Sequence, residues 1–292
     1  MPPDLSYAVI TPARDEADNL ERLSASLAAQ RHRPLHWVIV DNGSTDGTPN
    51  IIAALAEQHT WITSLAIPGE RDPVRGRPIV RAFMAGLAEL GDLPDVVVNL
   101  DADISFEPDY FERLLTAFEE DPRLGIASGS GYELDGTVWR QRHLTGSTVW
   151  GASRAYRRAC LADVLPLAER LGWDGTDEFK ANSRGWSTRT IVDLPFHHHR
   201  PEGGRDGAWR SRVEQGRVAY YMGYRPSYLA LRATFNGARH PTGFGLLWGY
   251  AAEAAQRAER EPDAGARAYV RRQQRARNLP ARLREARGGR SG

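Results

Sequence analysis

The 292-residue sequence has one cysteine, one lysine and no long hydrophobic run. The single cysteine, Cys160, cannot form an internal disulfide or a cysteine-based zinc site, and it is typical of a protein from a reducing compartment. No stretch of about 18 consecutive apolar residues is present, so the sequence predicts no membrane-spanning helix. The first ten residues also lack the charged start and apolar core of a signal peptide. We therefore expect a cytoplasmic protein.

The sequence also carries little net charge. Its formal value of +1 gives no indication of nucleic acid as a general partner. Arginine is nevertheless frequent near the C-terminus, at positions 271, 272, 275, 277, 282 and 284. A solvated helix face explains these arginines, and so does peripheral contact with an anionic membrane at its inner face. Both explanations stay open at this point.

What the sequence does contain is a regular alternation of apolar runs and amphipathic segments from residue 7 to about 132. The apolar runs predict strands at 7–11, 36–40, 61–67 and 96–100, with a further extended segment at 125–134. Between them, apolar residues recur at intervals of three and four, as in helices that pack one face on a sheet. This order is typical of parallel strands joined by crossover helices, and it predicts a Rossmann-like, mostly parallel sheet flanked by helices.

The second half is less regular. A helical pattern runs over 153–170, a polar stretch over 172–190, and a second helical pattern begins after about 208. We therefore expect a helical extension at the C-terminal end.

Polar residues gather where three of the predicted strands end. The clusters are Arg14-Asp15-Glu16, the turn from Asp41 to Asp46, and Asp101-Ala102-Asp103. Taken singly, each has a local explanation as a helix cap (Asp15 or Asp18 for the first), a tight turn or a solvated loop. Taken together, they should converge, because ligands bind beyond the carboxyl ends of strands in such sheets.

The third cluster is the most informative. Two carboxylates as close as those of Asp101 and Asp103 resist joint ionisation unless a cation offsets their repulsion. Mg²⁺ and Mn²⁺ take oxygen ligands and commonly bind through one or two carboxylates together with substrate phosphates. The pair therefore predicts a metal-diphosphate site, and Asp41 at the end of its strand would accept a hydrogen bond from a nucleotide base or ribose.

At this point a family resemblance becomes specific, because four motifs occur in order. They read ITPARDEADNLERLSASL, VIVDNGSTDGTPNII, RGRPIVRAFMAGL and VVVNLDADISFEPDYFERLL. This succession resembles the donor-binding half of the family 2 glycosyltransferases, which have the GT-A fold and use nucleotide-sugars. It covers residues 7 to about 132.

The resemblance implies roles for nine residues on the donor side. It implies that Asp41, with Asn42 beside it, contacts the base, and that the nucleoside pocket is lined by Pro12, Asp15 and Glu16. It implies that the DXD element, Asp101-Ala102-Asp103, binds the ribose and the metal-diphosphate. Arg77 stands where the family often has lysine, which implies an approach to the donor, although a solvated surface arginine explains it equally.

The segment GWDGTDEFKANSRGWSTRTIVDLPFHHHRPEGG resembles the acceptor side of bacterial members of the family. The resemblance implies that Asp177 is the catalytic base, with Glu178 as the second choice, and the alternative is a helix N-cap at Asp177. It also implies a histidine at the metal or diphosphate, which we place at His198 and then His199. Adjacent positions cannot share one direction, so at most two of His197 to His199 should face the site. A structural role for all three is the alternative.

Together these observations predict an inverting glycosyltransferase that depends on Mn²⁺ or Mg²⁺. The expected donor is a nucleotide-diphosphate sugar, with UDP favoured, and the expected acceptor is a hydroxyl of a glycan, a lipid-linked intermediate or a small metabolite. The expected divisions are a donor-binding half over 1–132, an acceptor-binding and catalytic half over 133–205, and a helical extension over 206–292. The alternatives are a nucleotidyltransferase acting on sugar phosphates and a nucleotide-sugar binding protein without turnover.

Overall fold

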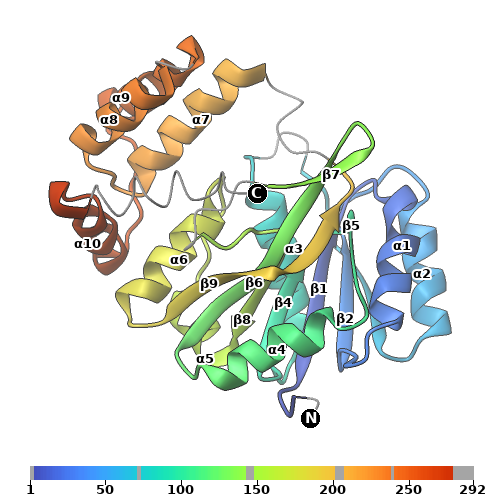
Figure 1. The fold of residues 1–292 in the computed structure, drawn as a ribbon. Coiled ribbons are helices and arrows are strands. Elements are labelled where there is room, and N and C mark those ends of the chain that lie inside the picture. Colours follow the sequence, from blue (N-terminus) through green and yellow to red (C-terminus); the bar gives the residue numbers. More distant parts are fainter. Residues whose placement is uncertain (1–2, 71–73, 143–147, 201–206, 238–239, 279–292) are drawn as a thin grey trace. The chain divides into compact units, whose positions relative to one another are not determined.

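The computed structural model describes residues 3–70, 74–142, 148–200, 207–237 and 240–278 (Figure 1). The chain divides into two compact units. The first consists of Met1–Ala181 and Gly185–Arg200, and the second of Asn182–Arg184 and Pro201–Gly292. The described part of the first unit holds a nine-stranded sheet with its helices, and the second is helical.

The sheet has the strand order β3-β2-β1-β4-β8-β6-β9-β5, with β7 paired to β6. The strands at its beginning are β1 (Tyr7–Ala13), β2 (His36–Asp41), β3 (Ile62–Ala66) and β4 (Val96–Leu100). Neighbours within this group run parallel, which confirms the Rossmann-like half predicted from the alternating pattern. Their carboxyl ends consequently lie on one edge of the sheet.

Beyond β4 the sheet is mixed. The strands there are β5 (Ile104–Phe106), β6 (Leu124–Asp135), β7 (Val138–Gln141), β8 (Ser153–Arg157) and β9 (Ser187–His198). β8 runs antiparallel to both β4 and β6, whereas β6 and β9 are parallel. The helical pattern expected over 153–170 is confirmed for α5 (Arg158–Val164) and wrong for its first five residues, which form β8, and for 165–170, which are not helical. The cause is that β8 is buried on both faces and contains the charged Arg154, so neither alternation nor a continuous apolar run marks it as a strand.

Helices cover both faces of the sheet. On one face lie α1 (Ala17–Ala28), α2 (Thr48–Gln58) and α4 (Tyr110–Glu120), whose apolar residues pack with Val9 and Val98. On the other lie α3 (Arg77–Leu90), α5 (Arg158–Val164) and α6 (Trp173–Ser183), which pack with Ile10 and Val97. Consecutive strand residues thus enter opposite core layers, as the pleat requires. Cys160 is buried in the second layer, in the packing role typical of a free cysteine.

The second unit contains four α-helices and two short 3₁₀ helices among its described residues. They are α7 (Gly207–Tyr221), α8 (Pro226–Gly237), η1 (Pro241–Phe244), α9 (Gly245–Ala255), α10 (Ala264–Gln273) and η2 (Ala276–Asn278). This confirms the predicted helical extension. None of the helices in the described ranges combines the length and the apolar character needed to cross a bilayer. Arg282 and Arg284 lie outside the described residues.

Candidate active site

The loops that follow β1 and β2 are tied together at the carboxyl edge of the sheet. Asp15 has a left-handed backbone with φ 56°, which is uncommon for a residue other than glycine. Its Oδ1 accepts hydrogen bonds from the backbone nitrogen of Thr45 at 2.7 Å and from the Thr45 hydroxyl at 3.1 Å. Asp15 therefore does not cap α1, as one local explanation expected, because Glu16 occupies the N-cap position. The backbone nitrogen of Glu16 donates to Thr48 Oγ1 at 2.8 Å, a second link between the loops.

The two residues at the end of β2 differ in their exposure to solvent. Asp41 is half-buried, and its Oδ1 accepts a hydrogen bond from the backbone nitrogen of Ser44 at 3.2 Å. Asn42 is buried, and its Nδ2 donates to the carbonyl of Pro78 at 3.3 Å. Pro12 lies beside them, paired with Val40 in the sheet.

Arg77 begins α3 and lies among carboxylates. Its Nη1 is 3.8 Å from Glu70 Oε2, and its Nε is 3.6 Å from Glu169 Oε2. Arg77 therefore forms ion pairs with Glu70 and Glu169. These ion pairs do not involve Asp101 or Asp103.

Asp101 and Asp103, which follow β4, meet His198 at the end of β9. One ligand atom from each of the three side chains lies within 4.8 Å of the other two. Within the cluster, Asp103 Oδ1 lies 3.3 Å from His198 Nε2. His198 reaches this position because it pairs with Ile104, the first residue of β5, in an antiparallel register. Asp103 and His198 are buried, and Asp101 is half-buried.

The charges around Asp103 favour its ionised form. Burial alone would raise the pKa of Asp103, but the hydrogen bond and charge of His198 and the charge of Arg200 bring that pKa below its ordinary value. Asp103 is therefore a carboxylate at neutral pH, as a cation ligand must be.

The structure does not bring His199 into this cluster. Neighbouring residues of a strand point to opposite faces, so His197 and His199 face away from His198. Both rings pack against Trp139, with centroids 4.4 Å and 5.3 Å away, and His199 Nε2 lies 2.8 Å from Ser105 Oγ. The assignment of His199 as a metal ligand is corrected on this ground.

Arg200 joins the cluster to the first loop. Its Nε lies 3.4 Å from Asp103 Oδ2, and its Nη2 lies 2.5 Å from Glu16 Oε2. The first and third polar clusters of the sequence therefore meet, as the strand-end argument expected. A guanidinium at this position is suited to the oxygens of a phosphate.

The donor atoms of the cluster fit a divalent cation. Two carboxylates and one imidazole match the ligand preferences of Mn²⁺, and the carboxylates also match those of Mg²⁺. The second ring nitrogen of His198, Nδ1, is buried without a hydrogen bond and lies 3.5 Å from Glu133 Oε1. In many metal sites a carboxylate that does not bind the metal orients a histidine that does. Glu133 lies in the corresponding place beside His198.

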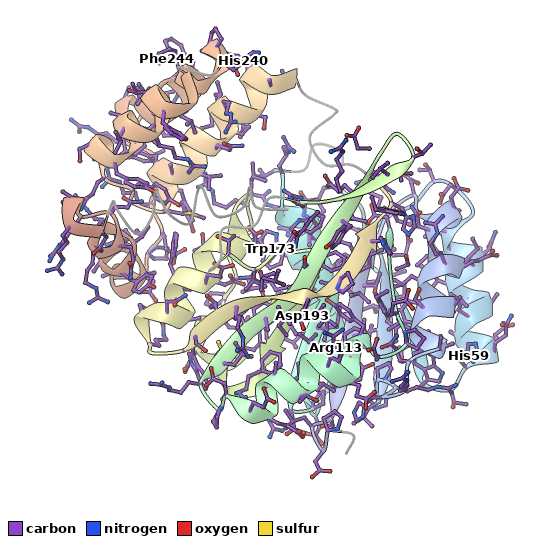
Figure 2. All side chains as sticks on the ribbon, viewed as in Figure 1. His59, Arg113, Trp173, Asp193, His240 and Phe244 are labelled. Atoms are coloured by element: carbon purple, nitrogen blue, oxygen red, sulfur yellow. The ribbon has the colours of Figure 1, made fainter. Side chains whose placement is uncertain are left out.

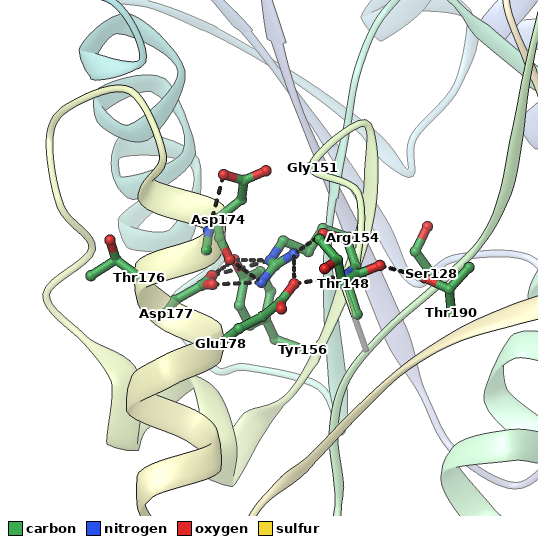
Figure 3. A network of polar contacts seen from close by, with 12 residues as sticks. Ser128, Thr148, Gly151, Arg154, Tyr156, Asp174, Thr176, Asp177, Glu178 and Thr190 are labelled. Atoms are coloured by element: carbon green, nitrogen blue, oxygen red, sulfur yellow. Dashed lines mark hydrogen bonds and ion pairs between the residues drawn. The ribbon is translucent and has the colours of Figure 1, made fainter. Parts of the chain in front are cut away.

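Asp177 and Glu178, the residues expected to act as base, are both buried against Arg154 (Figure 3). Asp177 is 1% exposed, and Arg154 contacts it through Nη2 at 2.5 Å from Oδ1 and Nε at 3.1 Å from Oδ2. The hydroxyl of Tyr156 donates to Asp177 Oδ2. Glu178 Oε1 accepts hydrogen bonds from the backbone nitrogen of Val149 at 2.7 Å and from Arg154 Nη1 at 3.2 Å.

This network does not favour Asp177 or Glu178 as the base, because both side chains are buried and hydrogen-bonded inside the protein. Asp177 also lies inside α6, so it is not the N-cap that the alternative expected. Burial raises the pKa of Asp177 to about 6 and that of Glu178 to about 8, with the charge of Arg154 acting in the opposite direction.

Asp174, one turn earlier in α6, has the exposure that Asp177 lacks. It is half-exposed, and Figure 3 shows its carboxylate directed away from the guanidinium of Arg154. A Cβ placed on Gly151 would lie 3.5 Å from Asp174 Oδ2, so the carboxylate faces that glycine.

The loop around Gly151 connects Asp174 to the DXD element. The carbonyl of Gly151 accepts a hydrogen bond from Asn99 Nδ2 at 2.9 Å. The next residue, Ala152, accepts one from the backbone nitrogen of Asp101 at 2.9 Å. Asp174 and Asp101 therefore flank the same short loop. Asp174 lies in the segment GWDGTDEFKANSRGW, but no sequence pattern distinguishes it from Asp177 as the accessible aspartate.

Comparison with solved structures supports the architecture. The mannosyltransferase PcManGT from Pyrobaculum calidifontis, solved with GDP-Man and Mn²⁺, matches 98% of this chain and 88% of its own at a TM-score of 0.57 and 17% identity. GalNAc-T7, solved with UDP, GalNAc and Mn²⁺, matches 88% of this chain and 55% of its own at a TM-score of 0.59 and 13% identity. These likenesses define a GT-A fold.

The sequence comparisons define the family. The profile described as glycosyl transferase family 2 matches residues 8–164, more than half of the chain, and the protein belongs to this family.

Two curated relatives act on lipid-linked substrates by their names. N-acetylglucosaminyl-diphospho-decaprenol L-rhamnosyltransferase of Mycobacterium tuberculosis is 29% identical over 47% of this chain and 45% of its own length. Undecaprenyl-phosphate 4-deoxy-4-formamido-L-arabinose transferase of Shewanella sediminis is 32% identical over 48% of this chain and 38% of its own. The chain thus spans less than half the length of these two relatives.

Proposed function

We propose that the protein is an inverting glycosyltransferase that moves a sugar from a nucleotide-diphosphate sugar to an acceptor hydroxyl, with Mn²⁺ or Mg²⁺ on the diphosphate. The observation that carries this proposal is the meeting of Asp101, Asp103 and His198 at the sheet edge, with ligand atoms within 4.8 Å of one another. Solved relatives of the same fold hold GDP-Man or UDP together with Mn²⁺, which supports the donor class.

The donor is held by groups at the ends of β1, β2 and β4. Asp41 accepts hydrogen bonds from the base, and the paired loops carrying Pro12, Asp15 and Glu16 line the nucleoside pocket. The residues that would hold the cation are Asp101, Asp103 and His198. A divalent cation there supplies positive charge that stabilises the departing diphosphate. Arg200, on the same edge, donates hydrogen bonds to a phosphate oxygen.

We assign the general base to Asp174. Inverting transfer needs a carboxylate within hydrogen-bond reach of the acceptor hydroxyl, on the side of the sugar opposite the diphosphate. Asp174 is the half-exposed carboxylate at the N-terminal end of α6, and it faces the loop that also contacts Asp101. Arg154 holds the backbone of Asp174 in place, because its Nη2 donates a hydrogen bond to the carbonyl oxygen of Asp174 at 2.6 Å.

For the acceptor we propose a hydroxyl on a lipid-linked intermediate. The hydroxyl is supported by the rhamnosyltransferase, named for N-acetylglucosaminyl-diphospho-decaprenol, whose sugar carries hydroxyls. The lipid is supported by both relatives, since the arabinose transferase is named for undecaprenyl phosphate. The glycan and small-metabolite alternatives predict activity with acceptors that carry no lipid, so the acceptor assay separates them.

The proposal is tested by donor binding and turnover with the purified chain. We expect one nucleotide-diphosphate sugar, a UDP-sugar first, to raise the melting temperature with Mn²⁺ and to raise it less with EDTA. At a ligand concentration 100 times the Kd, the stabilisation is about 2.7 kcal/mol. Asp103→Asn should remove the part of the rise in melting temperature that depends on Mn²⁺. His199→Gln changes a histidine outside the cluster and should keep that part.

The same samples separate the alternatives. A glycosyltransferase releases nucleoside diphosphate when acceptor is added. Release of pyrophosphate from a nucleoside triphosphate and a sugar phosphate would instead indicate a nucleotidyltransferase. Donor binding without turnover over a panel of lipid-linked and free acceptors would indicate a binding protein and would contradict the proposal.

A further inference from the structure

Helix α9 is apolar on both of its sides. Its inner side packs on α7, where the close approach of the backbones depends on Gly216, Gly245 and Gly249. Its outer side presents Phe244, Leu247 and Trp248, which are 49%, 36% and 67% exposed. Ala251, Ala254 and Ala255 continue this exposed side at helical spacing. A helix that is hydrophobic all round is typical of one covered on all sides, so the outer side predicts a partner.

Helix α7 adds a second tryptophan next to this side. Trp209 is 49% exposed, and its carbonyl oxygen lies 3.2 Å from the position of a Cβ on Gly245. The backbone of Trp209 therefore lies against Gly245, the residue after Phe244, and we call Trp209, Phe244, Leu247 and Trp248 the aromatic face. Figure 2 shows Phe244 at the same end of these helices as His240.

The surroundings of the aromatic face are positively charged. Among the described residues of α7, α8, η1 and α9, the acidic side chains are Glu214 and Glu253, and Arg217 contacts them at 2.8 Å and 3.6 Å. The other arginines of these helices, at positions 210, 212 and 232, have no acidic counterpart within the same described helices. Arg212 borders the aromatic face, because its Cβ lies 3.0 Å from the position of a Cβ on Gly245.

A polar hollow beside Trp209 adds a site for an anion. It measures about 350 Å³ and is lined by Ala208, Ser211, Arg212, Gln215, His240 and Thr242. The guanidinium, the imidazole and the two hydroxyls are groups that bind phosphate oxygens. A phosphate headgroup in this hollow would stand next to acyl chains at Trp209 and Phe244.

We propose that the aromatic face binds the surface of an anionic lipid bilayer. The exposed tryptophan and phenylalanine supply apolar surface that a bilayer can bury, and the arginines of the neighbouring helix α7 supply attraction to anionic lipids, the two contributions that hold helices in the membrane interface. With 11 residues, α9 extends about 16 Å, too short to span the ~30 Å hydrocarbon layer, so it lies along the surface. A second copy of the chain on this face would bring like charges together, which opposes association. The inference goes beyond the proposed function, because it depends on neither the donor nor the acceptor.

The test is flotation of the full chain with vesicles of phosphatidylcholine alone and of phosphatidylcholine with phosphatidylglycerol. We expect binding to the anionic vesicles, weakened by salt, because the arginines supply part of the attraction. The double variant Phe244→Ser/Trp248→Ser should reduce the affinity by about tenfold or more, since each side chain loses its apolar burial. Leu35→Ser, which changes an exposed leucine 56% accessible in the first unit, should leave binding unchanged.

A fluorescent probe gives an independent readout. The one natural cysteine is buried, so Leu247→Cys offers one accessible site for an environment-sensitive dye. The emission should shift to the blue when anionic vesicles are added, and a dye at Leu35→Cys should not respond.

Four results would overturn the proposal: absence of binding to anionic vesicles, equal binding of the double variant, a dimer that Phe244→Ser/Trp248→Ser dissociates, or a dye at position 247 that is already shielded without lipid. The last two would indicate that another protein surface covers the aromatic face. Binding of the nucleotide-diphosphate sugar with Mn²⁺ by the double variant, measured without lipid, should equal that of the parent and keeps this test separate from that of the proposed function.

Discussion

Asp174→Asn is expected to lower kcat by about 10²–10⁴-fold while leaving the Kd for the nucleotide-diphosphate sugar unchanged. The amide keeps the size of the side chain but cannot take the proton of the acceptor hydroxyl. Because Asp174 is half-exposed at the end of α6, the variant should keep the melting temperature of the parent. The measurement is steady-state turnover with donor and acceptor, together with donor titration in the absence of acceptor.

Asp177→Asn is the matched control for this prediction. Loss of the Asp177 carboxylate leaves Arg154 with a weaker partner inside the protein, so this variant should lose stability as well as activity. The combination of retained stability and lost turnover is therefore specific to Asp174. Turnover of Asp174→Asn at the rate of the parent would contradict the assignment of the base.

Arg154→Leu is expected to lower the free energy of unfolding by about 3–5 kcal/mol, because it leaves the buried carboxylate of Asp177 without its counter-charge and buried Glu178 without one of its hydrogen-bond donors. Arg154 is 0% exposed and contacts Asp177, Glu178 and the carbonyls of Val149 and Asp174. It therefore fixes α6 and the loop beside Gly151 to β8. Chemical denaturation at pH 7 measures the effect, and a loss below 1 kcal/mol would show that the network does not hold these elements together.

Glu178→Gln changes the same buried network without removing Arg154. Its effect on the free energy of unfolding should depend on pH. Burial raises the pKa of Glu178 from 4.5 to about 8, so between these values the folded protein holds a proton that the unfolded chain has lost. The stability of the parent should therefore be highest at the acidic end of this range and fall as the pH rises towards 8. Glutamine has no proton to lose, so the variant should gain stability relative to the parent between pH 5 and pH 9. An identical pH dependence for both proteins would contradict a protonated Glu178.

The sequence predicted the donor side of the fold well because its signals are local. Each parallel strand is a short apolar run followed by polar residues, and parallel strands place their ends on one edge. Arg200 joins Asp103 to Glu16 across that edge, which brings together two clusters that lie far apart in the sequence. The position of His198, opposite Ile104, depends on a pairing between β9 and β5 that no local pattern encodes.

The acceptor side was harder to predict because its organising residue is a buried charge. Arg154 made β8 resemble a helical segment, and it also decides which aspartate of α6 is inside the protein. Asp174 and Asp177 are three residues apart, and the sequence alone contains no signal that one binds a guanidinium from another strand. His199 was placed at the metal for a related reason, since the register of β9 decides which of three adjacent histidines faces Asp103.

The central claim is that Asp101, Asp103 and His198 hold a divalent cation, and pulsed electron paramagnetic resonance of bound Mn²⁺ tests it most directly. A coordinated imidazole adds a nitrogen coupling to the Mn²⁺ signal, so the parent protein should show this coupling. His198→Gln should lose it, and His199→Gln should retain it. A nitrogen coupling that persists in His198→Gln, or the absence of bound Mn²⁺ in the parent with nucleoside diphosphate present, would contradict the account.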